Sequence, residues 1–163
     1  MLGATMIVSL RYGFVLVLLS LALVCPASGD PEHYASIRRE HAFLREGPSY
    51  AHKVLWIYRR RNFPVKIIGS YDAWRRVKDV EGTVGWIHRT QLSEMRTVVF
   101  IGRTPTIVRS DSSPSSRAVA YAQRGVVAKL TGCKLQVCKV EISAIDGWVD
   151  KRSIWGVSLS ELF

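Results

Sequence analysis

The sequence predicts an all-β protein in which two small barrels follow one another in tandem, preceded by an N-terminal signal peptide. Three observations indicate this fold class. The chain opens with an apolar stretch of the kind that directs export. One pattern of aromatic, glycine and β-branched residues then occurs twice. Within each copy apolar residues alternate with polar ones over short runs, and no long segment has the period of an amphipathic helix.

Residues 1–27 are predicted to be the signal peptide. Arg11 supplies a positive charge before an almost wholly apolar run at 12–24, and small or helix-breaking residues follow. This order is typical of a secretory signal, and the run is shorter than the roughly 20 residues that span a bilayer. We expect cleavage after Ala27, with Gly29 as the alternative site, and a periplasmic location. The alternative is a retained membrane anchor, the one form in which we expect contact with a membrane.

The repeat divides the rest of the chain into two units, which we place at residues 33–95 and 96–163. Three segments of the first unit match segments of the second in the same order: 43–45 with 107–109, 74–77 with 137–140, and 85–86 with 147–148. The offsets are 64, 63 and 62 residues, respectively. Ordered matches whose spacing drifts so little indicate the duplication of one structural unit.

The first unit contains three predicted strands in a row. Residues 64–68 are rich in β-branched side chains, and 74–78 alternate large apolar with charged side chains, which is the pattern of a half-buried strand. Residues 79–82 predict a hairpin turn that ends in glycine, where a positive φ is needed. The chain then returns as a strand at 84–88. A glycine inside that strand, Gly85, indicates a bulge or a close backbone approach.

The second unit repeats this plan, with strands expected at 126–130, 137–142 and 147–149. Strands this short, in units of about 60 residues, are best accommodated by a closed or nearly closed barrel. Closure removes the unpaired edges that an open sheet would expose to aggregation.

With these segments in place, the first unit resembles the bacterial SH3 domain, especially the version duplicated in small exported proteins of Gram-negative bacteria. The residues that carry the resemblance are Leu44-Arg45-Glu46-Gly47-Pro48-Ser49, 64–68, 74–77, Gly82, 85–88 and Leu92. The second unit keeps Val108-Arg109, Gly125 and Gly147-Trp148-Val149 but lacks the Gly-Pro-Ser segment. The resemblance implies a five-stranded SH3-like barrel for each unit and a role in binding without catalysis. In relatives attached to cell-wall enzymes, such domains target peptidoglycan or its peptides.

Two cysteines remain once the leader is removed, Cys133 and Cys138. The offset of 63 places them at the positions of Ser70 and Arg75, which flank a turn, so they are expected on facing strands of a hairpin. Cross-strand spacing suits a disulfide, worth about 2 kcal/mol for so short a loop. Two free thiols are the alternative. A redox or zinc centre is disfavoured, because there is no Cys-x-x-Cys spacing and no further ligand nearby.

Aromatic and basic side chains of the first unit are the candidate ligand-binding residues: Tyr50, Trp56, Tyr58, Arg59, Arg60, Arg61, Trp74 and Arg75. The first six lie between the Gly-Pro turn and the next predicted strand, where SH3-like barrels have the loops that bound a peptide groove. Aromatic rings there can stack on a ligand, and the arginines can attract carboxylates or phosphates. The alternatives are plain packing for the aromatic residues, Trp74 above all, and a solvated face for the arginines.

The chain carries a formal net charge of +10, which favours anionic partners. Export makes nucleic acid an unsuitable partner, so we expect a peptide or protein ligand of the cell envelope, with peptidoglycan among the candidates. No catalytic motif, metal-ligand spacing or phosphate-binding glycine loop is present in the sequence. We therefore expect no enzyme activity, no metal and no cofactor. The rival hypothesis is a membrane-retained adaptor that docks protein partners.

Overall fold

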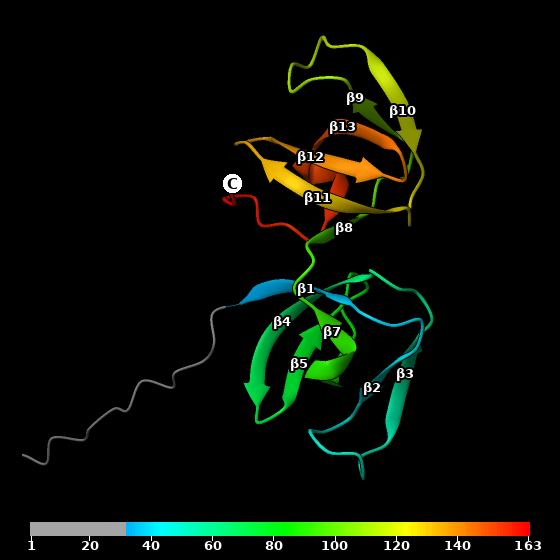
Figure 1. Cartoon of the computed structure of the whole chain (residues 1–163), viewed down its shortest axis with the longest axis vertical. Helices are drawn as coiled ribbons and strands as arrows, with labels where there is room; N and C mark the ends of the chain where they lie inside the picture. Colours follow the sequence, from blue (N-terminus) through cyan, green and yellow to red (C-terminus); the bar gives the residue numbers. More distant parts are fainter. Residues whose placement is uncertain (1–31) are drawn as a thin grey trace, which may run out of the picture.

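The computed structural model describes residues 32–163, and the predicted signal peptide of residues 1–27, with its cleavage site after Ala27, lies outside them. The described chain forms two β lobes that follow one another along the sequence (Figure 1). Each lobe is one antiparallel sheet with its own apolar core. Within this part of the chain, no helix is long and apolar enough to cross a bilayer.

The first lobe, domain 1, consists of seven strands and one short 3-10 helix. These are β1 (His33–Ile37), β2 (Ala42–Arg45), β3 (Val54–Tyr58), β4 (Pro64–Tyr71), β5 (Trp74–Lys78), β6 (Val84–His88), η1 (Arg89–Gln91) and β7 (Leu92–Ser93). In the sheet they lie in the order β3-β2-β6-β5-β4-β1-β7. The strands predicted at 64–68, 74–78 and 84–88 are β4, β5 and β6. The predicted turn joins β5 to β6, with Gly82 at a φ of 89°.

The second lobe, domain 2, repeats this arrangement. Its elements are β8 (Thr97–Phe100), β9 (Thr106–Arg109), β10 (Ala118–Ala122), β11 (Val127–Cys133), β12 (Val137–Ile142), β13 (Ile145–Asp150), η2 (Lys151–Ser153) and β14 (Ile154–Trp155). The sheet order is β10-β9-β13-β12-β11-β8-β14. Each strand occupies the place of the strand seven numbers earlier, so the expected tandem pair of like domains is confirmed.

Each sheet has seven strands, whereas five per barrel are expected from the sequence. The sequence pattern misses the end strand β3. It detects β2 only as the short repeat match at residues 43–45. Leu55, Trp56 and Ile57 are exposed in succession on β3, so this strand has no apolar–polar alternation for a sequence pattern to detect. The all-β class and the SH3-like organisation hold; the added strands extend each sheet.

Gly85 allows β6 to lie directly against β2. A Cβ atom at Gly85 would lie 2.6 Å from Leu44 Cγ and 2.8 Å from the carbonyl oxygen of Arg45. In domain 2 a Cβ at Gly147 would lie 2.4 Å from Val108 Cγ1. These separations are too short for any side chain, so the Gly-Trp pair marks the same close strand crossing in both copies. Of the two expectations for Gly85, the close backbone approach is the correct one.

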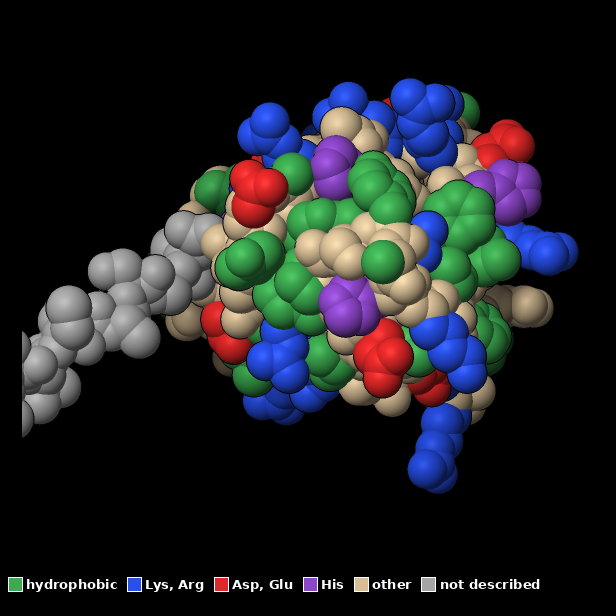
Figure 2. Space-filling model, turned by 90° about the horizontal axis from the view of Figure 1, so that it is seen from below, with side chains coloured by type: hydrophobic (Ala, Val, Ile, Leu, Met, Phe, Trp, Pro, Cys, Tyr) green, Lys and Arg blue, Asp and Glu red, His purple; other side chains and the backbone are tan. Residues whose placement is uncertain are grey.

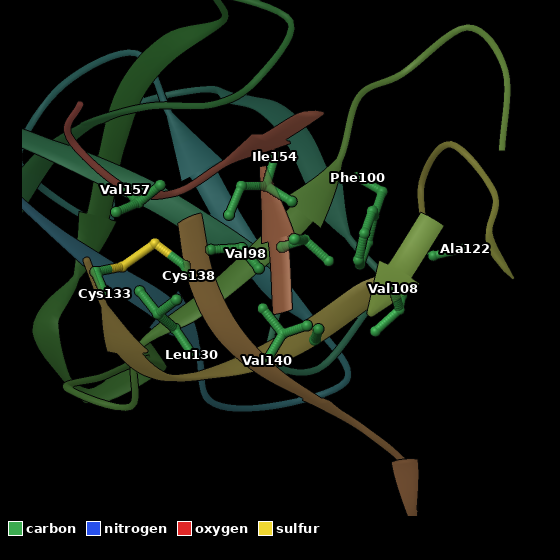
Figure 3. Close-up of a cluster of buried hydrophobic side chains, with 12 residues drawn as sticks. Val98, Phe100, Val108, Ala122, Leu130, Cys133, Cys138, Val140, Ile154 and Val157 are labelled. Atoms are coloured by element: carbon green, nitrogen blue, oxygen red, sulfur yellow. A yellow bond between two sulfur atoms is a disulfide. The ribbon is translucent and has the colours of Figure 1, made fainter. Parts of the chain in front are cut away.

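Each domain buries a separate cluster of aliphatic and aromatic side chains. The core of domain 1 contains Ala35, Ile37, Ala42, Leu44, Tyr58, Val65, Ile67, Val77, Ile87 and Leu92. The core of domain 2 contains Val98, Phe100, Val108, Ala122, Ala128, Leu130, Cys133, Cys138, Val140, Val149, Ile154 and Val157 (Figure 3). Two cores in one chain mean that each sheet is stabilised mainly by its own buried surface.

The disulfide between Cys133 and Cys138 joins β11 to β12, as expected. The two residues face one another in the strand register, with their Cα atoms 4.1 Å apart. Ser70 and Arg75 face one another at the same place in domain 1, so the offset of 63 places the pair correctly. The bond packs beside Leu130 in the core (Figure 3). Its place in the apolar interior indicates a structural role.

The two domains are in contact as well as linked. Tyr34 of β1 packs edge-on against Trp155 of β14, with the ring centroids 5.4 Å apart. The hydroxyl of Thr97 donates a hydrogen bond to the carbonyl oxygen of Asn62 at 2.8 Å. The link at 94–96 is short, and the first residue of β8 already contacts the turn between β3 and β4. These contacts give the domains a defined relative placement.

Candidate functional site

A cleft of about 810 Å³ opens in domain 1 beside the exposed end strand β3. Its walls are formed by Trp56, Ile57, Tyr58, Arg59, Arg60, Phe63, Asp79, Glu81 and Thr83. We call this site the β3 cleft. Four of the eight candidate residues lie in it: Trp56, Tyr58, Arg59 and Arg60. The structure thus brings half of the candidate set to one site.

Two segments position the side chains of the β3 cleft. Strand β3 and the turn that follows it supply aromatic and basic residues, and the turn between β5 and β6 supplies two carboxylates. Trp56 is 58% exposed, so most of its indole ring is open to a ligand. Because β3 ends the sheet, its outer edge is not covered by another strand of the described chain.

Tyr58 and Asp79 form the fixed wall of the cleft. The phenol of Tyr58 donates a hydrogen bond of 2.9 Å to Asp79 Oδ2, and both side chains are buried. The other carboxylate oxygen of Asp79 accepts the backbone N–H groups of Glu81 at 3.0 Å and Thr83 at 2.8 Å. Phe63 stacks on the Tyr58 ring, with the centroids 6.0 Å apart. The turn and the strand are therefore held together by one buried polar network.

Burial, followed by the negative charge and the hydrogen bond of Asp79, raises the pKa of Tyr58 far above its ordinary value of 10.0. The phenol consequently stays protonated and remains a hydrogen-bond donor at physiological pH. Its proton is committed to Asp79. Tyr58 thus fixes the wall of the cleft, and its hydroxyl is not available to a ligand.

The arginines after β3 differ in their placement. Arg59 and Arg60 line the cleft, whereas Arg61 is exposed and does not. Arg60 also reaches domain 2, where its guanidinium donates a hydrogen bond of 2.6 Å to the carbonyl oxygen of Gly125. Glu81, on the opposite wall, forms a 3.6 Å ion pair with Arg124. The turn between β10 and β11 of domain 2 therefore lies at the rim of the cleft.

Tyr50 and Trp74 lie together in a second group, which we call the aromatic cluster. The ring of Tyr50 meets Trp74 edge-on at 5.0 Å and lies 5.6 Å from the ring of His88. Arg45 stacks over Tyr50 at 5.5 Å and donates hydrogen bonds to the carbonyl oxygens of Tyr50 and His52. Trp74 is only 5% exposed, but Tyr50 is 65% exposed. Packing is therefore the role of Trp74, and Tyr50 is the ring that a ligand can reach.

Figure 2 shows the end of the molecule formed by domain 1. Apolar side chains gather at its centre with histidines beside them, and both basic and acidic side chains lie around them. A surface with an apolar middle and a charged rim suits a ligand that combines apolar with charged groups.

Arg75 is separated from both groups. Its guanidinium donates to the carbonyl oxygens of Asp72 and Trp74 at 3.0 and 3.1 Å. It lines a second depression, of about 440 Å³, together with His33, Arg38, Ile67, Arg89, Thr90, Leu92 and Glu94. We call this depression the basic pocket.

Several residues of these sites are absent from the candidate set: Arg45, Phe63, Asp79, Glu81, Thr83 and His88. The sequence contains a signal for one of them. Asp79 begins a tight turn in which an aspartate side chain commonly caps backbone N–H groups, but nothing local indicates that Tyr58, 21 residues away, is its partner.

Domain 2 lacks the polar network of the β3 cleft. By strand register, the equivalents of Trp56, Tyr58 and Asp79 are Ala120, Ala122 and Ile142. These substitutions remove the exposed indole ring and replace the buried hydrogen bond by apolar contact. The two domains share a fold but present different surfaces at this position. Within residues 32–163, no group of three or more His, Cys, Asp or Glu side chains is placed to hold a metal ion.

Comparison with known proteins gives one family match. The family model of the bacterial SH3 domain matches residues 38–94 and again residues 103–156. No curated protein sequence matches the chain significantly.

Two solved structures from Trichomonas vaginalis are among the similar folds. NlpC1 is 14% identical, with a TM-score of 0.36 over 84% of this chain and 50% of its own. NlpC2 is 11% identical, with a TM-score of 0.35 over 76% of this chain and 48% of its own. The chain thus spans about half the length of these structures.

Proposed function

The chain belongs to the bacterial SH3 domain family, and from this premise we propose that it is an exported, non-catalytic module that binds a peptide ligand of the cell envelope. Peptidoglycan stem peptides are the ligand class that we favour. The binding surface is the β3 cleft of domain 1, with the aromatic cluster beside it on the same domain. In this proposal the leader at residues 1–27 is removed, domain 1 spans 33–95, domain 2 spans 96–163, and the protein works in the periplasm.

One observation carries this proposal: the β3 cleft combines an exposed indole ring, a rigid apolar wall and two arginines. Trp56 can stack against an extended peptide or sugar face, and the Tyr58–Asp79 hydrogen bond holds the wall in place before a ligand arrives. Arg59 and Arg60 can pair with carboxylates. Stem peptides offer both features, because they carry short apolar side chains and free carboxylates.

The test is co-sedimentation of the protein with purified peptidoglycan sacculi at low salt. We expect the protein to pellet with the sacculi, and we expect Trp56→Ala to weaken binding by about tenfold or more, as is usual for a central aromatic contact. Tyr121→Ala is the matched control, because Tyr121 is an exposed aromatic residue on β10, the domain 2 equivalent of β3. This control is expected to bind like the wild type.

Two outcomes contradict the proposal. A wild-type protein that stays in the supernatant at low salt does not bind the cell wall, and the ligand is then to be sought among envelope proteins. Equal binding by the Trp56→Ala variant and the wild type shows that the β3 cleft is not the binding surface, even where the sacculi are bound.

A further inference from the structure

The basic pocket of domain 1 has a counterpart in domain 2, and there the position is filled by the chain itself. After β14, residues 157–163 run back over domain 2. Glu161 forms an ion pair with Arg96, and Arg96 also donates a hydrogen bond of 3.0 Å to the carbonyl oxygen of Gly156. Phe163 and Cys133 exchange backbone hydrogen bonds at 2.8 and 3.3 Å. We call residues 157–163 the tail.

Lys151 completes the attachment of the tail. It is 2% exposed, and its ammonium group donates hydrogen bonds to the carbonyl oxygens of Leu159, at 3.1 Å, and Glu161. A buried ammonium is tolerated only where acceptors replace its hydration. The tail turns at Ser158–Glu161, where the backbone N–H of Glu161 donates to the carbonyl oxygen of Ser158 at 3.1 Å. Domain 2 thus binds a short turned segment by cationic side chains that hold one carboxylate and several backbone carbonyls.

Strand register shows that the two places are equivalent. Trp74 pairs with His88 in domain 1, as Val137 pairs with Asp150 in domain 2. It follows that, in the basic pocket, His33 corresponds to Arg96 and Arg89 to Lys151. Leu92 corresponds to Ile154, and Arg75 to Cys138. Two of these counterparts, Arg96 and Lys151, are the residues that hold the tail.

In domain 1 the same place forms the basic pocket. After β7 the chain passes directly into β8 of domain 2, so no segment follows that could fold back as the tail does. Arg38, Arg75 and Arg89 line this pocket from three different segments: the stretch after β1, strand β5 and helix η1. Among the described residues, none of these three guanidinium groups forms a salt bridge. Glu94 also lines the pocket but forms no salt bridge with these arginines within the described chain, so the pocket carries more positive than negative charge.

We propose that the basic pocket binds a short acidic peptide segment of a partner protein, held against domain 1 as the tail is held against domain 2. The equivalent positions supply the geometry, and the arginines supply the preference for carboxylates, because a guanidinium pairs with a carboxylate in bidentate fashion. The tail of a second copy is a poorer occupant: it has a single acid, Glu161, which is already paired with Arg96. Three guanidinium groups call for a segment with several acids.

This site shares no residue with the β3 cleft and does not depend on the proposed function. The test uses two synthetic peptides, acetyl-Val-Ser-Leu-Glu-Glu-Glu-Phe and the same peptide with glutamine at the three glutamate positions. Each is titrated into the 15N-labelled protein. We expect the acidic peptide to shift the backbone amide signals of Arg38, Arg75 and Arg89, and the glutamine peptide to bind at least about tenfold more weakly, since each charge-assisted contact is lost.

Matched variants separate the site from general electrostatic attraction. The Arg89→Glu variant is expected to lose at least about tenfold in affinity for the acidic peptide. Arg103→Glu changes the net charge equally at an exposed position of domain 2 and is expected to bind like the wild type. If Arg89→Glu disturbs the fold, Arg89→Gln is tested in its place and is also expected to lower the affinity for the acidic peptide. Trp56→Ala is expected to bind the acidic peptide normally, even if it no longer binds sacculi.

Three results overturn the proposal. One is equal affinity of the acidic and glutamine peptides. Another is equal loss of affinity in Arg89→Glu and Arg103→Glu, which means that only net charge matters. The third is tighter binding of a peptide with the sequence of residues 156–163 than of the acidic peptide, which would make a second copy the occupant.

Discussion

At the scale of single residues, the hydrogen bond between Tyr58 and Asp79 decides whether the β3 cleft is preformed. Asp79 is buried, and it accepts from one phenol and from two backbone N–H groups of its own turn. A buried carboxylate that loses a donor retains the cost of leaving water. The wall of the cleft should therefore be sensitive to a change as small as one hydroxyl group.

We predict that Tyr58→Phe lowers the free energy of unfolding by about 1.5–3 kcal/mol at neutral pH, the usual value for a hydrogen bond to a charged group. Urea denaturation measures the change. Tyr121→Phe is the control, because Tyr121 is 67% exposed, and it should alter stability by less than about 0.5 kcal/mol. A Tyr58→Phe protein as stable as the wild type would show that the hydrogen bond does not form in solution.

The same variant has a characteristic pH dependence. Burial and Asp79 raise the pKa of Tyr58 above its ordinary value of 10.0, so the protonated phenol is favoured in the folded state. The hydrogen bond from this phenol contributes fully to the free energy of unfolding below about pH 10. The contribution is lost as the pH rises through the folded-state pKa of Tyr58. The difference in stability between wild type and Tyr58→Phe should accordingly be constant from pH 7 to 9 and shrink above pH 10.

The grouping of residues into a site can be predicted from the sequence where those residues lie close together along the chain. Trp56, Tyr58, Arg59 and Arg60 stand out as an aromatic and basic run, and they do meet in one cleft. Arg75 was grouped with them by composition alone, but the structure places it in the basic pocket, because strand pairing and not charge decides its neighbours.

At the scale of secondary structure, the tail is held to domain 2 by polar contacts around Glu161. Burial alone would raise the pKa of Glu161, but hydrogen bonds from Arg96 and from the backbone of Ser158, with the charges of Arg96 and Lys151, lower it below its ordinary value of 4.5. The ionised form is therefore favoured in the folded state. Arg96 lies between the rings of Tyr34 and Phe163, at 5.6 and 5.9 Å, which fixes its position.

We predict that Glu161→Gln destabilises the protein by about 1 kcal/mol at pH 7, a value reduced because the ion pair is partly screened by solvent. A group with a lowered pKa contributes stability above its unfolded pKa and loses it as the pH falls through the folded pKa. Wild type and Glu161→Gln should thus differ by a constant amount from pH 7 to about 5 and converge below pH 4. Urea denaturation at each pH measures this. A difference in stability at pH 3 as large as that at pH 7 would rule out the ion pair as its cause.

Strands can be predicted from the sequence where buried and exposed side chains alternate, and they escape prediction where this alternation is missing. Strands β4, β5 and β6 combine β-branched residues with a regular inward face, and the sequence locates them to within a few residues. Strand β3 presents three exposed residues in a row, and the path of the tail depends on Lys151 and Arg96, which lie far from it in sequence. Neither feature has a local pattern.

At the scale of the whole molecule, the question is whether two sheets with separate cores act as one body. Domain 1 and domain 2 meet through Tyr34 and Trp155, through Thr97 and Asn62, and through the turn that carries Gly125. Duplication explains why two cores exist, because each copy carries a full set of apolar strand positions. It does not by itself explain the contact, since equivalent positions carry different residues in the two copies: Tyr34 corresponds to Thr97 and Asn62 to Gly125.

We predict a measurable coupling between the domains through the ring pair of Tyr34 and Trp155. In a double-mutant cycle, the losses from Tyr34→Ala and Trp155→Ala should fall short of additivity by about 0.5–1.5 kcal/mol, the range for an edge-on aromatic pair. The cycle of Tyr34→Ala with Tyr121→Ala is the control and should be additive within about 0.3–0.5 kcal/mol, because Tyr121 contacts neither ring. Additivity in the first cycle would mean that the domains separate in solution. The rim of the β3 cleft, to which Gly125 and Arg124 contribute, would then be present only part of the time.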